Sequence, residues 1–311
     1  MEIPRLRDFI RDTDGWLYAV CAYDNHEKIG CILRYVPDAN GQRTDESGQR
    51  YNKIGFEDAY ALIEKEKPEY SDIIQRVPVQ DVVEVLKPDE HIQALASGDE
   101  RISRLLTLFR LPKGKFGVTG SMLCGLAGPD SDIDGVVYGN YFPTAQNRLR
   151  QGIMNGTIED LDEELWHRVY KKREPEIPYD EFLLHEQRKW NRGQIEGTYF
   201  DLLYTRDYAD IQEISCSRGE ILGKEIITAD VTDATLGFDS PARFYIDHPD
   251  IDCILSFTHT YSGQVQKGET AQACGVIERH GDTCWLVIGT TRQAKGEYIR
   301  SLSLIEQSEE I

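Results

Sequence analysis

A glycine–serine pair and two aspartates lie close together in the middle of the chain, at Gly120, Ser121, Asp132 and Asp134. The pair follows the apolar stretch 116–119, so it stands where a strand is expected to end and a helix to begin. A glycine there lets the backbone approach a phosphate, and the serine hydroxyl and the N–H groups that open a helix can donate to it. The pattern predicts a turn that binds a triphosphate.

The two aspartates are one residue apart at the start of the next apolar stretch, 132–138. Side chains alternate along a strand, so Asp132 and Asp134 are expected on one face while Ile133 enters the core. Two carboxylates about 5 Å apart repel by about 3 kcal/mol at an effective dielectric constant of about 20, and a cation would offset this repulsion. Oxygen ligands beside a phosphate suit Mg²⁺ or Mn²⁺. The alternative is that Asp132 and Asp134 are simply an exposed acidic pair. That interpretation would be favoured for the two aspartates considered by themselves, but not for aspartates that follow the turn at Gly120.

A single carboxylate, Asp201, stands in the apolar stretch 198–204. Burying an unpaired carboxylate is costly, so we expect its charge to be compensated. Asp201 is therefore either a third ligand of the predicted metal site or a structural carboxylate in a salt bridge. In the loop before Asp132, Asp130 and Ser131 are expected to shape the turn, and Ser131 could also contact phosphate.

The stretch FGVTGSMLCGLAGPDSDIDGVVYG, residues 116–139, resembles the signature of the DNA polymerase beta superfamily of nucleotidyltransferases. In that superfamily a strand ends in Gly-Ser, a helix and loop follow, and an Asp-x-Asp pair lies on the next strand. The resemblance implies an α/β (α+β) fold with a mixed sheet and helices, and a metal-dependent enzyme that uses a nucleoside triphosphate such as ATP. It assigns catalysis and metal binding to Asp132, Asp134 and Asp201, and nucleotide binding to Gly120, Ser121 and Ser131.

Two flanking runs, SFTHTY at 256–261 and GTTR at 289–292, are similar to uncharacterised archaeal proteins described only as predicted nucleotidyltransferases. The leading hypothesis is an enzyme that moves a nucleoside monophosphate from a nucleoside triphosphate to a hydroxyl of RNA, a protein or a small molecule, with release of pyrophosphate. The alternative is a catalytically inactive nucleotide- or RNA-binding regulator on the same fold. A weaker third hypothesis is the antitoxin-like modification of a partner protein. The sequence names no acceptor, base preference or oligomeric state.

The element pattern predicts three domains, at residues 1–86, 87–218 and 219–311. The first is an α+β domain that opens with a hairpin, the second carries the nucleotidyltransferase core, and the third consists of short, closely spaced strands. A small barrel such as an OB-fold is one arrangement that fits the third domain.

The composition excludes several classes of protein. No apolar run approaches the roughly 20 residues of a membrane span, and the N-terminus does not resemble a secretory signal. The seven cysteines and seven histidines are scattered, without a Cys-x-x-Cys pair or a helical histidine pair for zinc. We therefore expect a cytoplasmic protein with no membrane partner.

The net charge of −19 argues against indiscriminate binding to nucleic acid. Residues 101–200 nevertheless hold 14 basic against 14 acidic side chains, so the acidic excess lies in the flanks. Most of these basic residues are expected on solvated helix faces, but Arg188, Lys189 and Arg192 could reach the triphosphate or an RNA acceptor. Five aromatic and basic residues of the C-terminal region could instead form a stacking surface for single-stranded nucleic acid: Phe257, His259, Tyr261, Arg292 and Lys295. The favoured interpretation is that they belong to the barrel core and to ordinary surface.

Overall fold

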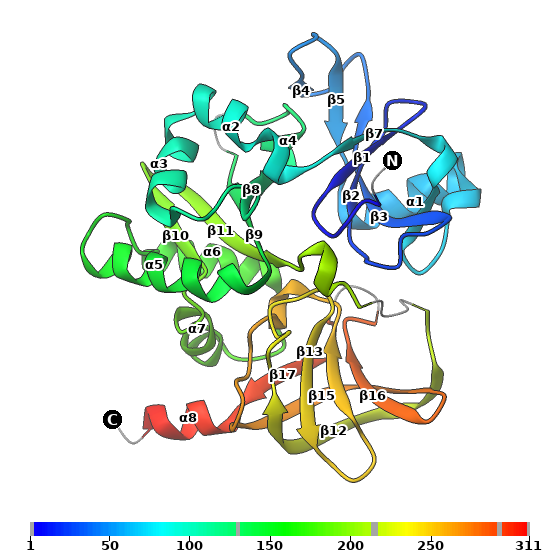
Figure 1. Cartoon of the computed structure of the whole chain (residues 1–311). Coiled ribbons are helices and arrows are strands. Elements are labelled where there is room, and N and C mark those ends of the chain that lie inside the picture. Colours follow the sequence, from blue (N-terminus) through cyan, green and yellow to red (C-terminus); the bar gives the residue numbers. More distant parts are fainter. Residues whose placement is uncertain (1–2, 129–130, 213–216, 291–293, 310–311) are drawn as a thin grey trace. The chain divides into compact units, whose positions relative to one another are not determined.

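The structure is a computed structural model that describes residues 3–128, 131–212, 217–290 and 294–309. The chain forms two compact units, drawn with their elements in Figure 1. Unit 1 comprises Met1–Asp160 and Asn191–Cys216, and unit 2 comprises Leu161–Trp190 and Ser217–Ile311. The segment 161–190, which the sequence places in the middle domain, thus groups with the C-terminal strands, and the three-domain division stays a prediction.

Unit 1 begins with a seven-stranded antiparallel sheet in the order β4-β5-β3-β2-β1-β7, with β6 paired to β3. Its strands are β1 (Phe9–Asp12), β2 (Leu17–Val20), β3 (Lys28–Pro37), β4 (Arg43–Thr44), β5 (Arg50–Lys53), β6 (Gln75–Pro78) and β7 (Val82–Leu86). β2 and β3 form the antiparallel hairpin that the sequence predicts.

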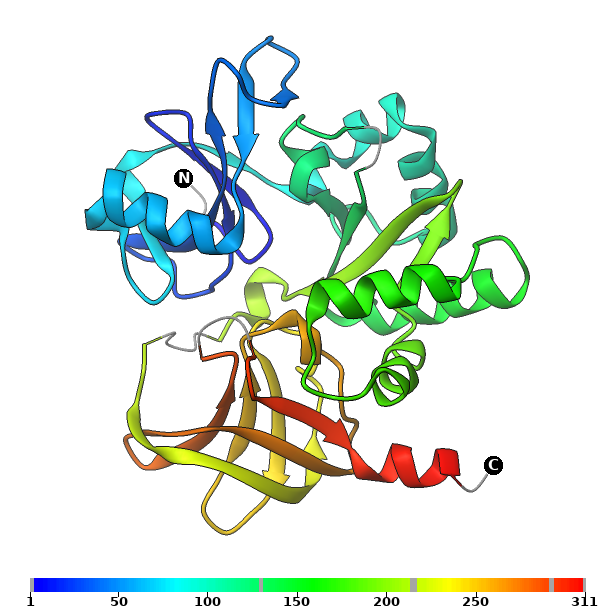
Figure 2. The same ribbon diagram turned by 180° about the vertical axis from the view of Figure 1, so that it is seen from behind.

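Both faces of this first sheet are buried. Ile10 packs in one core with Ile63 of α1 (Phe56–Glu66), and Figure 2 shows α1 lying along the strands. Its neighbour Phe9 points to the other face, into a second core that contains Leu123 of α4 (Gly120–Leu123). Because side chains alternate along a strand, β1 connects the helix on one side with the predicted phosphate-binding turn on the other.

The second sheet of unit 1 has the order β10-β11-β9-β8. Its strands are β8 (Phe116–Thr119), β9 (Ile133–Tyr138), β10 (Arg192–Ile195) and β11 (Thr198–Thr205). β9 and β11 run parallel, whereas β8 and β10 are antiparallel to their neighbours. The helices around this sheet are α2 (Pro88–Gly98), α3 (Glu100–Phe109) and α5 (Phe142–Met154). Asp99 is the N-cap of α3, since its side chain accepts a hydrogen bond from the Arg101 N–H.

Helices α3 and α5 lie on one face of the second sheet. The Phe109 ring of α3 lies 5.3 Å from the Phe116 ring and 6.4 Å from the Phe200 ring, between ring centroids. Phe200 is the register partner of Ile133, so Ile133 faces the helices too. The residues that alternate with them, Asp134 and Asp201, must therefore point to the opposite face.

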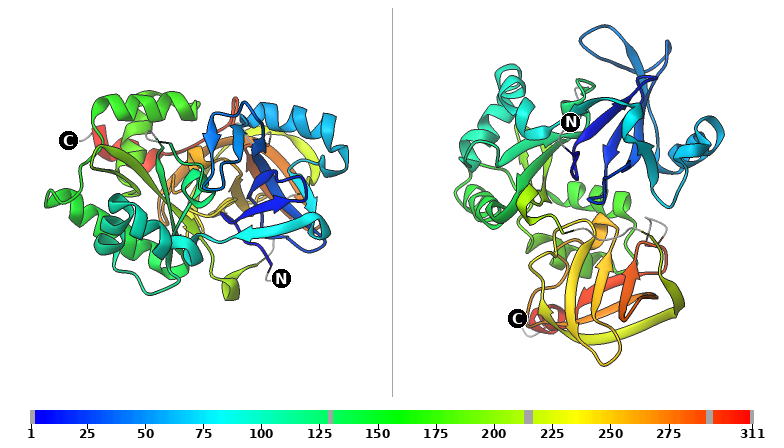
Figure 3. Two further views of the ribbon diagram at one scale, coloured as in Figure 1. Left: turned by 90° about the horizontal axis from the view of Figure 1, so that it is seen from above. Right: turned by 45° about the vertical axis from the view of Figure 1, so that its right-hand side comes forward.

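Unit 2 contains a closed five-stranded barrel. Its order is β12-β13-β14-β16-β15, β15 pairs back to β12, and β17 is added on β15 (Figure 3). The strands are β12 (Glu220–Asp233), β13 (Ala242–Asp247), β14 (Cys253–Ser256), β15 (Thr270–His280), β16 (Thr283–Ile288) and β17 (Tyr298–Ser301). β14 and β16 are parallel and the other pairs antiparallel. This arrangement is consistent with the predicted OB-like barrel and confirms the mixed α+β fold class.

Three helices complete unit 2: α6 (Glu163–Arg173), α7 (Tyr179–Gln187) and α8 (Leu302–Glu309). β14 ends at Ser256, and a 3₁₀ turn at His259–Tyr261 follows it. Thr258 caps this turn by accepting a hydrogen bond from the Thr260 N–H, and such local bonds compete with a strand ladder. Among the described residues, no helix has the length and apolar character needed to cross a membrane.

Candidate active site

Four polar side chains form a row across the second sheet of unit 1. Thr119 on β8 is the register partner of Asp134 on β9, Asp134 of Asp201 on β11, and Asp201 of Arg192 on β10. Register partners on neighbouring strands lie about 4.8 Å apart and point to the same face. The sheet therefore places the predicted carboxylates Asp134 and Asp201 side by side, on the face opposite α3 and α5.

Asp132 lies two residues before Asp134, directly before β9 begins. Both side chains are partly exposed, whereas the intervening Ile133 is fully buried. Strand alternation predicts this difference in exposure, because it places both carboxylates on one face and Ile133 on the other.

Gly120 brings the backbone against the aspartate row. Its φ is +71°, a conformation that only glycine adopts without strain, and an added Cβ would lie 2.6 Å from Oδ2 of Asp134. The one-turn helix α4 begins at this residue, and the first N–H groups of a helix have no partner within it. Because α4 has only four residues, its dipole is small, and these N–H groups with the Ser121 hydroxyl are what the turn offers a phosphate.

Ser131 fixes the loop in front of Asp132. Its hydroxyl oxygen accepts hydrogen bonds from the Gly128 N–H at 2.9 Å and from Nη1 of Arg43 at 3.2 Å. Arg43 also donates to the Leu126 carbonyl oxygen at 3.3 Å. Ser131 thus has the turn-shaping role that the sequence suggests, and its predicted contact with phosphate stays a prediction. The neighbouring Asp130 lies outside the described residues.

The N-terminal part of unit 1 contributes groups to the site that sequence reasoning missed. Arg43 of β4 reaches the loop before Asp132, and the carbonyl oxygen of Arg7 accepts a 2.6 Å hydrogen bond from the Thr119 hydroxyl in the aspartate row. Burial raises the pKa of Tyr35 to about 12; Cys124 and Asp134 add to this rise, whereas Arg34 and Arg43 oppose it. These residues of the first sheet therefore lie within electrostatic range of the predicted site.

Asp201 is paired with a guanidinium. Its Oδ1 lies 2.8 Å from Nε of Arg192, and only 9% and 6% of the two side chains are exposed. The two atoms are in ion-pair contact without the alignment of a hydrogen bond. Burial by itself would lower the pKa of Arg192, but attraction to Tyr199 and Asp201 outweighs burial and raises it, so the guanidinium stays charged. The salt bridge of one interpretation of Asp201 is therefore present, and its role as a metal ligand stays a prediction.

This pairing decides which residues fit a divalent cation. Within the described part of the chain, no three His, Cys, Asp or Glu side chains are arranged to hold a metal ion. Mg²⁺ in nucleotide sites is commonly held by one or two carboxylates, with water and substrate phosphate as its other ligands. Asp132 and Asp134 fit this requirement, whereas Oδ1 of Asp201 is taken by Arg192.

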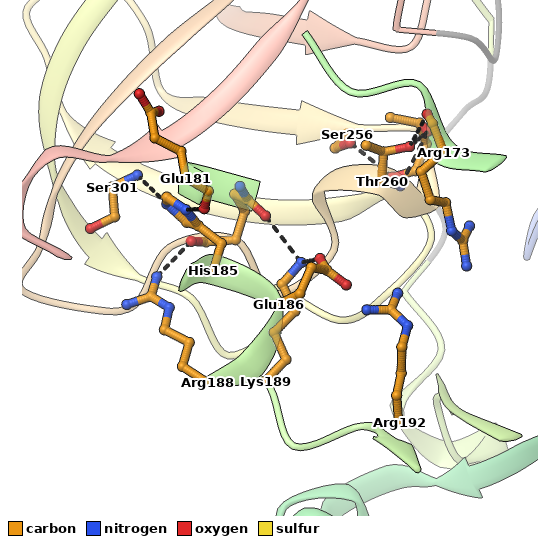
Figure 4. A network of polar contacts seen from close by, with 12 residues as sticks. Arg173, Glu181, His185, Glu186, Arg188, Lys189, Arg192, Ser256, Thr260 and Ser301 are labelled. Atoms are coloured by element: carbon orange, nitrogen blue, oxygen red, sulfur yellow. Dashed lines mark hydrogen bonds and ion pairs between the residues drawn. The ribbon is translucent and has the colours of Figure 1, made fainter. Parts of the chain in front are cut away.

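Two of the three basic residues predicted to reach the triphosphate are committed elsewhere, within unit 2. Lys189 forms a buried ion pair with Glu186 (Figure 4). It also donates to Oε1 of Gln264 at 3.0 Å. Arg188 forms an ion pair with Glu269. These pairs neutralise both cations, so the expectation that Arg188 or Lys189 is available to bind a triphosphate is wrong for this structure.

His185 joins α7 to β17 within the same network (Figure 4). Its Nδ1 lies 2.6 Å from the Glu181 carbonyl oxygen, and its Nε2 faces the Ser301 N–H at 2.9 Å. Nε2 must therefore accept a hydrogen bond, which assigns the ring proton to Nδ1. Burial lowers the pKa of His185 to about 4, because a second ring proton would be desolvated and would oppose the Ser301 N–H.

The predicted stacking surface of the C-terminal region does not include Tyr261. This side chain is fully buried, and its hydroxyl accepts a hydrogen bond from the Glu176 N–H at 3.0 Å. Barrel core, the interpretation that the sequence favours, is therefore correct for Tyr261. Arg292 lies outside the described residues.

Comparison with known families finds a nucleotidyltransferase domain in the part of the chain that contains the predicted turn and aspartate pair. The family model of the nucleotidyltransferase domain matches residues 101–191, a range that contains Gly120, Asp132 and Asp134 and ends before Asp201. The match supports nucleotidyl transfer as the general function.

The chain is 33% identical to the uncharacterized protein MJ1086 of Methanocaldococcus jannaschii, over an alignment that covers 95% of this chain and 98% of that protein. It belongs to the same family as this archaeal protein, which confirms the resemblance drawn from the sequence. No solved structure matches the chain.

Proposed function

We propose that this protein transfers a nucleoside monophosphate from a nucleoside triphosphate to a hydroxyl of an RNA, protein or small-molecule acceptor. The observation that carries the proposal is the register of Asp134 opposite Asp201, beside the turn at Gly120. The family match supports the transfer in general terms. The acceptor class and the use of a metal ion belong to the proposal.

Different residues of the site would bind the phosphates, hold the loop and act on the acceptor. The N–H groups that open α4 and the Ser121 hydroxyl would bind phosphate oxygens, because they are donors that need no counter-ion. Arg43 would hold the loop before Asp132 in place through its bond to Ser131. As the acceptor oxygen bonds to the α-phosphorus, the bond to pyrophosphate breaks. Asp201 would orient the acceptor hydroxyl and receive its proton once its ion pair with Arg192 has opened.

A divalent cation, Mg²⁺ or Mn²⁺, would be held by Asp132 and Asp134 together with the substrate phosphates. When bound, it would neutralise the charge of the triphosphate and stabilise the leaving pyrophosphate. Without it, the adjacent carboxylates would repel the triphosphate. A contribution from Asp201 would need the ion pair with Arg192 to open.

Transfer of label from an α-³²P nucleoside triphosphate, with Mg²⁺ and RNA, protein or small-molecule acceptors, tests the proposal. We expect labelled product from the wild type and a loss of about 100-fold or more for Asp132→Asn and Asp134→Asn. Glu64→Gln, which removes an exposed carboxylate from α1, is the matched control and should retain activity. Absence of turnover and of self-labelling by the wild type in every acceptor pool would refute the proposed transfer.

A second function has its own support, because the Arg192–Asp201 ion pair removes one carboxylate from metal binding. On this alternative the protein is a regulator that binds a nucleotide or RNA without transferring it. Calorimetry with nucleotide, RNA and Mg²⁺ separates the two. A regulator should keep its affinity for RNA in the Asp132→Asn/Asp134→Asn double variant, whereas an enzyme should lose metal binding and turnover together.

A further inference from the structure

A cavity of about 560 Å³ lies in unit 1 between α3, α5 and the loop that follows α5. Three arginines stand on its wall: Arg104 in the middle of α3, Arg110 directly after α3, and Arg148 on α5. Leu108 and Ile158 add apolar surface. The described residues of the wall include no aspartate or glutamate, in a chain whose net charge is −19.

This cavity is on the opposite face of the second sheet from the aspartate row. Ile195 of β10 lines the cavity, and a Cβ added at Gly193 of the same strand would meet Phe200 and Ile158. Gly193 and Ile195 are two residues apart, so they share the face that α3 and α5 cover. Asp201 follows Phe200 and therefore points away from the cavity. The cavity is separate from the proposed transfer site.

The contacts of the arginines leave positive charge in the cavity wall. Nε of Arg110 donates to the Thr107 carbonyl oxygen at 3.0 Å, and Arg148 donates to the Phe109 carbonyl oxygen. Both acceptors are neutral and each guanidinium has five N–H donors, so these bonds neither compensate the charge nor use up the donors. Arg104 has a carboxylate partner, Glu196, but more than half of its side chain is exposed. Exposed ion pairs of this kind are weak and exchange readily with other anions.

We propose that this cavity binds an organic phosphate of about the size of a mononucleotide. Guanidinium groups from two helices converge on one space, as recognition of a phosphate requires, because several N–H groups can bond its oxygens at once. The volume lies within the range of small-molecule sites, about 300–1,000 Å³. Leu108, Ile158 and Ile195 would contact the sugar or base. The described residues that line the cavity include no aromatic ring for stacking, so the phosphate supplies the recognition.

Calorimetric titration of the full chain tests this site, with EDTA present to suppress metal-dependent binding at the aspartates. The probes are ATP, inorganic phosphate and a short 5′-phosphorylated RNA. We expect ATP to bind, and Arg110→Gln and Arg148→Gln each to weaken the binding by about tenfold. The affinity should also fall as the salt concentration rises. ATP binding tighter than that of RNA identifies a free nucleotide as the ligand, and the reverse order identifies an RNA end.

Two controls separate this site from the surface charge and from the transfer site. Arg150→Gln removes the same charge from the same helix at a position outside the cavity wall, so it should leave the affinity within about twofold. Combined with Asp134→Asn, the Arg110→Gln variant should weaken binding by the same factor as it does alone, because the two sites are separate. Arg110 is exposed, so its replacement tests binding even where Arg148→Gln lowers stability through the lost bond to Phe109.

The proposal does not rest on the proposed transfer reaction, and the two can fail separately. It is overturned by an absence of binding for all three probes at millimolar concentration. It is also overturned by equal losses in the Arg110→Gln and Arg150→Gln variants, or by a loss of stability in Arg110→Gln and Arg148→Gln without any loss of affinity.

Discussion

Replacing Arg192 by methionine leaves the Asp201 carboxylate buried without its cation. Both side chains are more than 90% buried, and removing one partner of such a pair costs about 3–5 kcal/mol in the free energy of unfolding. The neighbouring Asp134 adds to the repulsion, because it is the register partner of Asp201. We therefore expect Arg192→Met to destabilise unit 1 by a loss in this range.

A divalent cation should restore part of this stability if the carboxylates form a metal site. Mg²⁺ that binds only the folded state, at about 100 times its dissociation constant, contributes about 2.7 kcal/mol. In Arg192→Met it gains access to Oδ1 of Asp201, so it should stabilise the variant more than the wild type. Urea denaturation with and without Mg²⁺ measures the difference, and hydrogen exchange of the β11 amides assigns it to this sheet.

Lys189→Met is the matched control, because it breaks another buried ion pair, with Glu186 in unit 2. Its loss should be of similar size and insensitive to Mg²⁺, since no row of carboxylates lies in register there. Equal stabilisation of the wild type and Arg192→Met by Mg²⁺ would refute the idea that Asp134 and Asp201 share a cation site. A loss below about 1 kcal/mol for Arg192→Met would refute the buried ion pair itself.

Three further predictions follow from the geometry. Gly120→Ala should lower the free energy of unfolding by about 1–3 kcal/mol and lower label transfer, because the added Cβ would collide with Asp134. Gly125 also has a positive φ, but a Cβ there would meet open space, so Gly125→Ala should show the backbone strain without the loss of transfer. Arg43→Met should lower the free energy of unfolding by about 1–2 kcal/mol in urea, since its bonds to Leu126 and Ser131 are lost, and an unchanged midpoint would count against those bonds. The His185 ring should titrate near pH 4 in an NMR titration. Because the pKa of the folded state is depressed, the neutral ring contributes about 3 kcal/mol of stability above pH 6.5, and this contribution is lost as the pH falls toward 4. A measured pKa near 6.5 would contradict the buried neutral ring.

The local pattern around the site could be predicted from the sequence. The apolar stretches predicted β8, β9 and β11, and glycine's freedom at positive φ predicted the turn at Gly120. Alternation along β9 placed Asp132 and Asp134 together, since the side-chain period of a strand is fixed by its backbone. The closely spaced C-terminal strands likewise indicated a small β barrel.

Other features depend on partners that are distant in the sequence. The lone carboxylate Asp201 predicted a compensating charge, but only the pairing of β10 with β11 identified Arg192 as its source. Arg43 is 88 residues from Ser131 in the sequence, and no local pattern predicts the hydrogen bond between them. The helical segment 161–190 was assigned to the middle domain by its position in the chain, whereas it groups with the barrel.

The sequence by itself thus determined which residues could bind phosphate and a cation, because residue type, backbone freedom and strand alternation are local properties. Tertiary structure alone decided that the row continues from Asp134 through Asp201 to Arg192, since strand order and register are set by packing between distant segments. It also decided that three arginines from two helices share one cavity on the opposite face, because their positions depend on how α3 and α5 pack against the sheet.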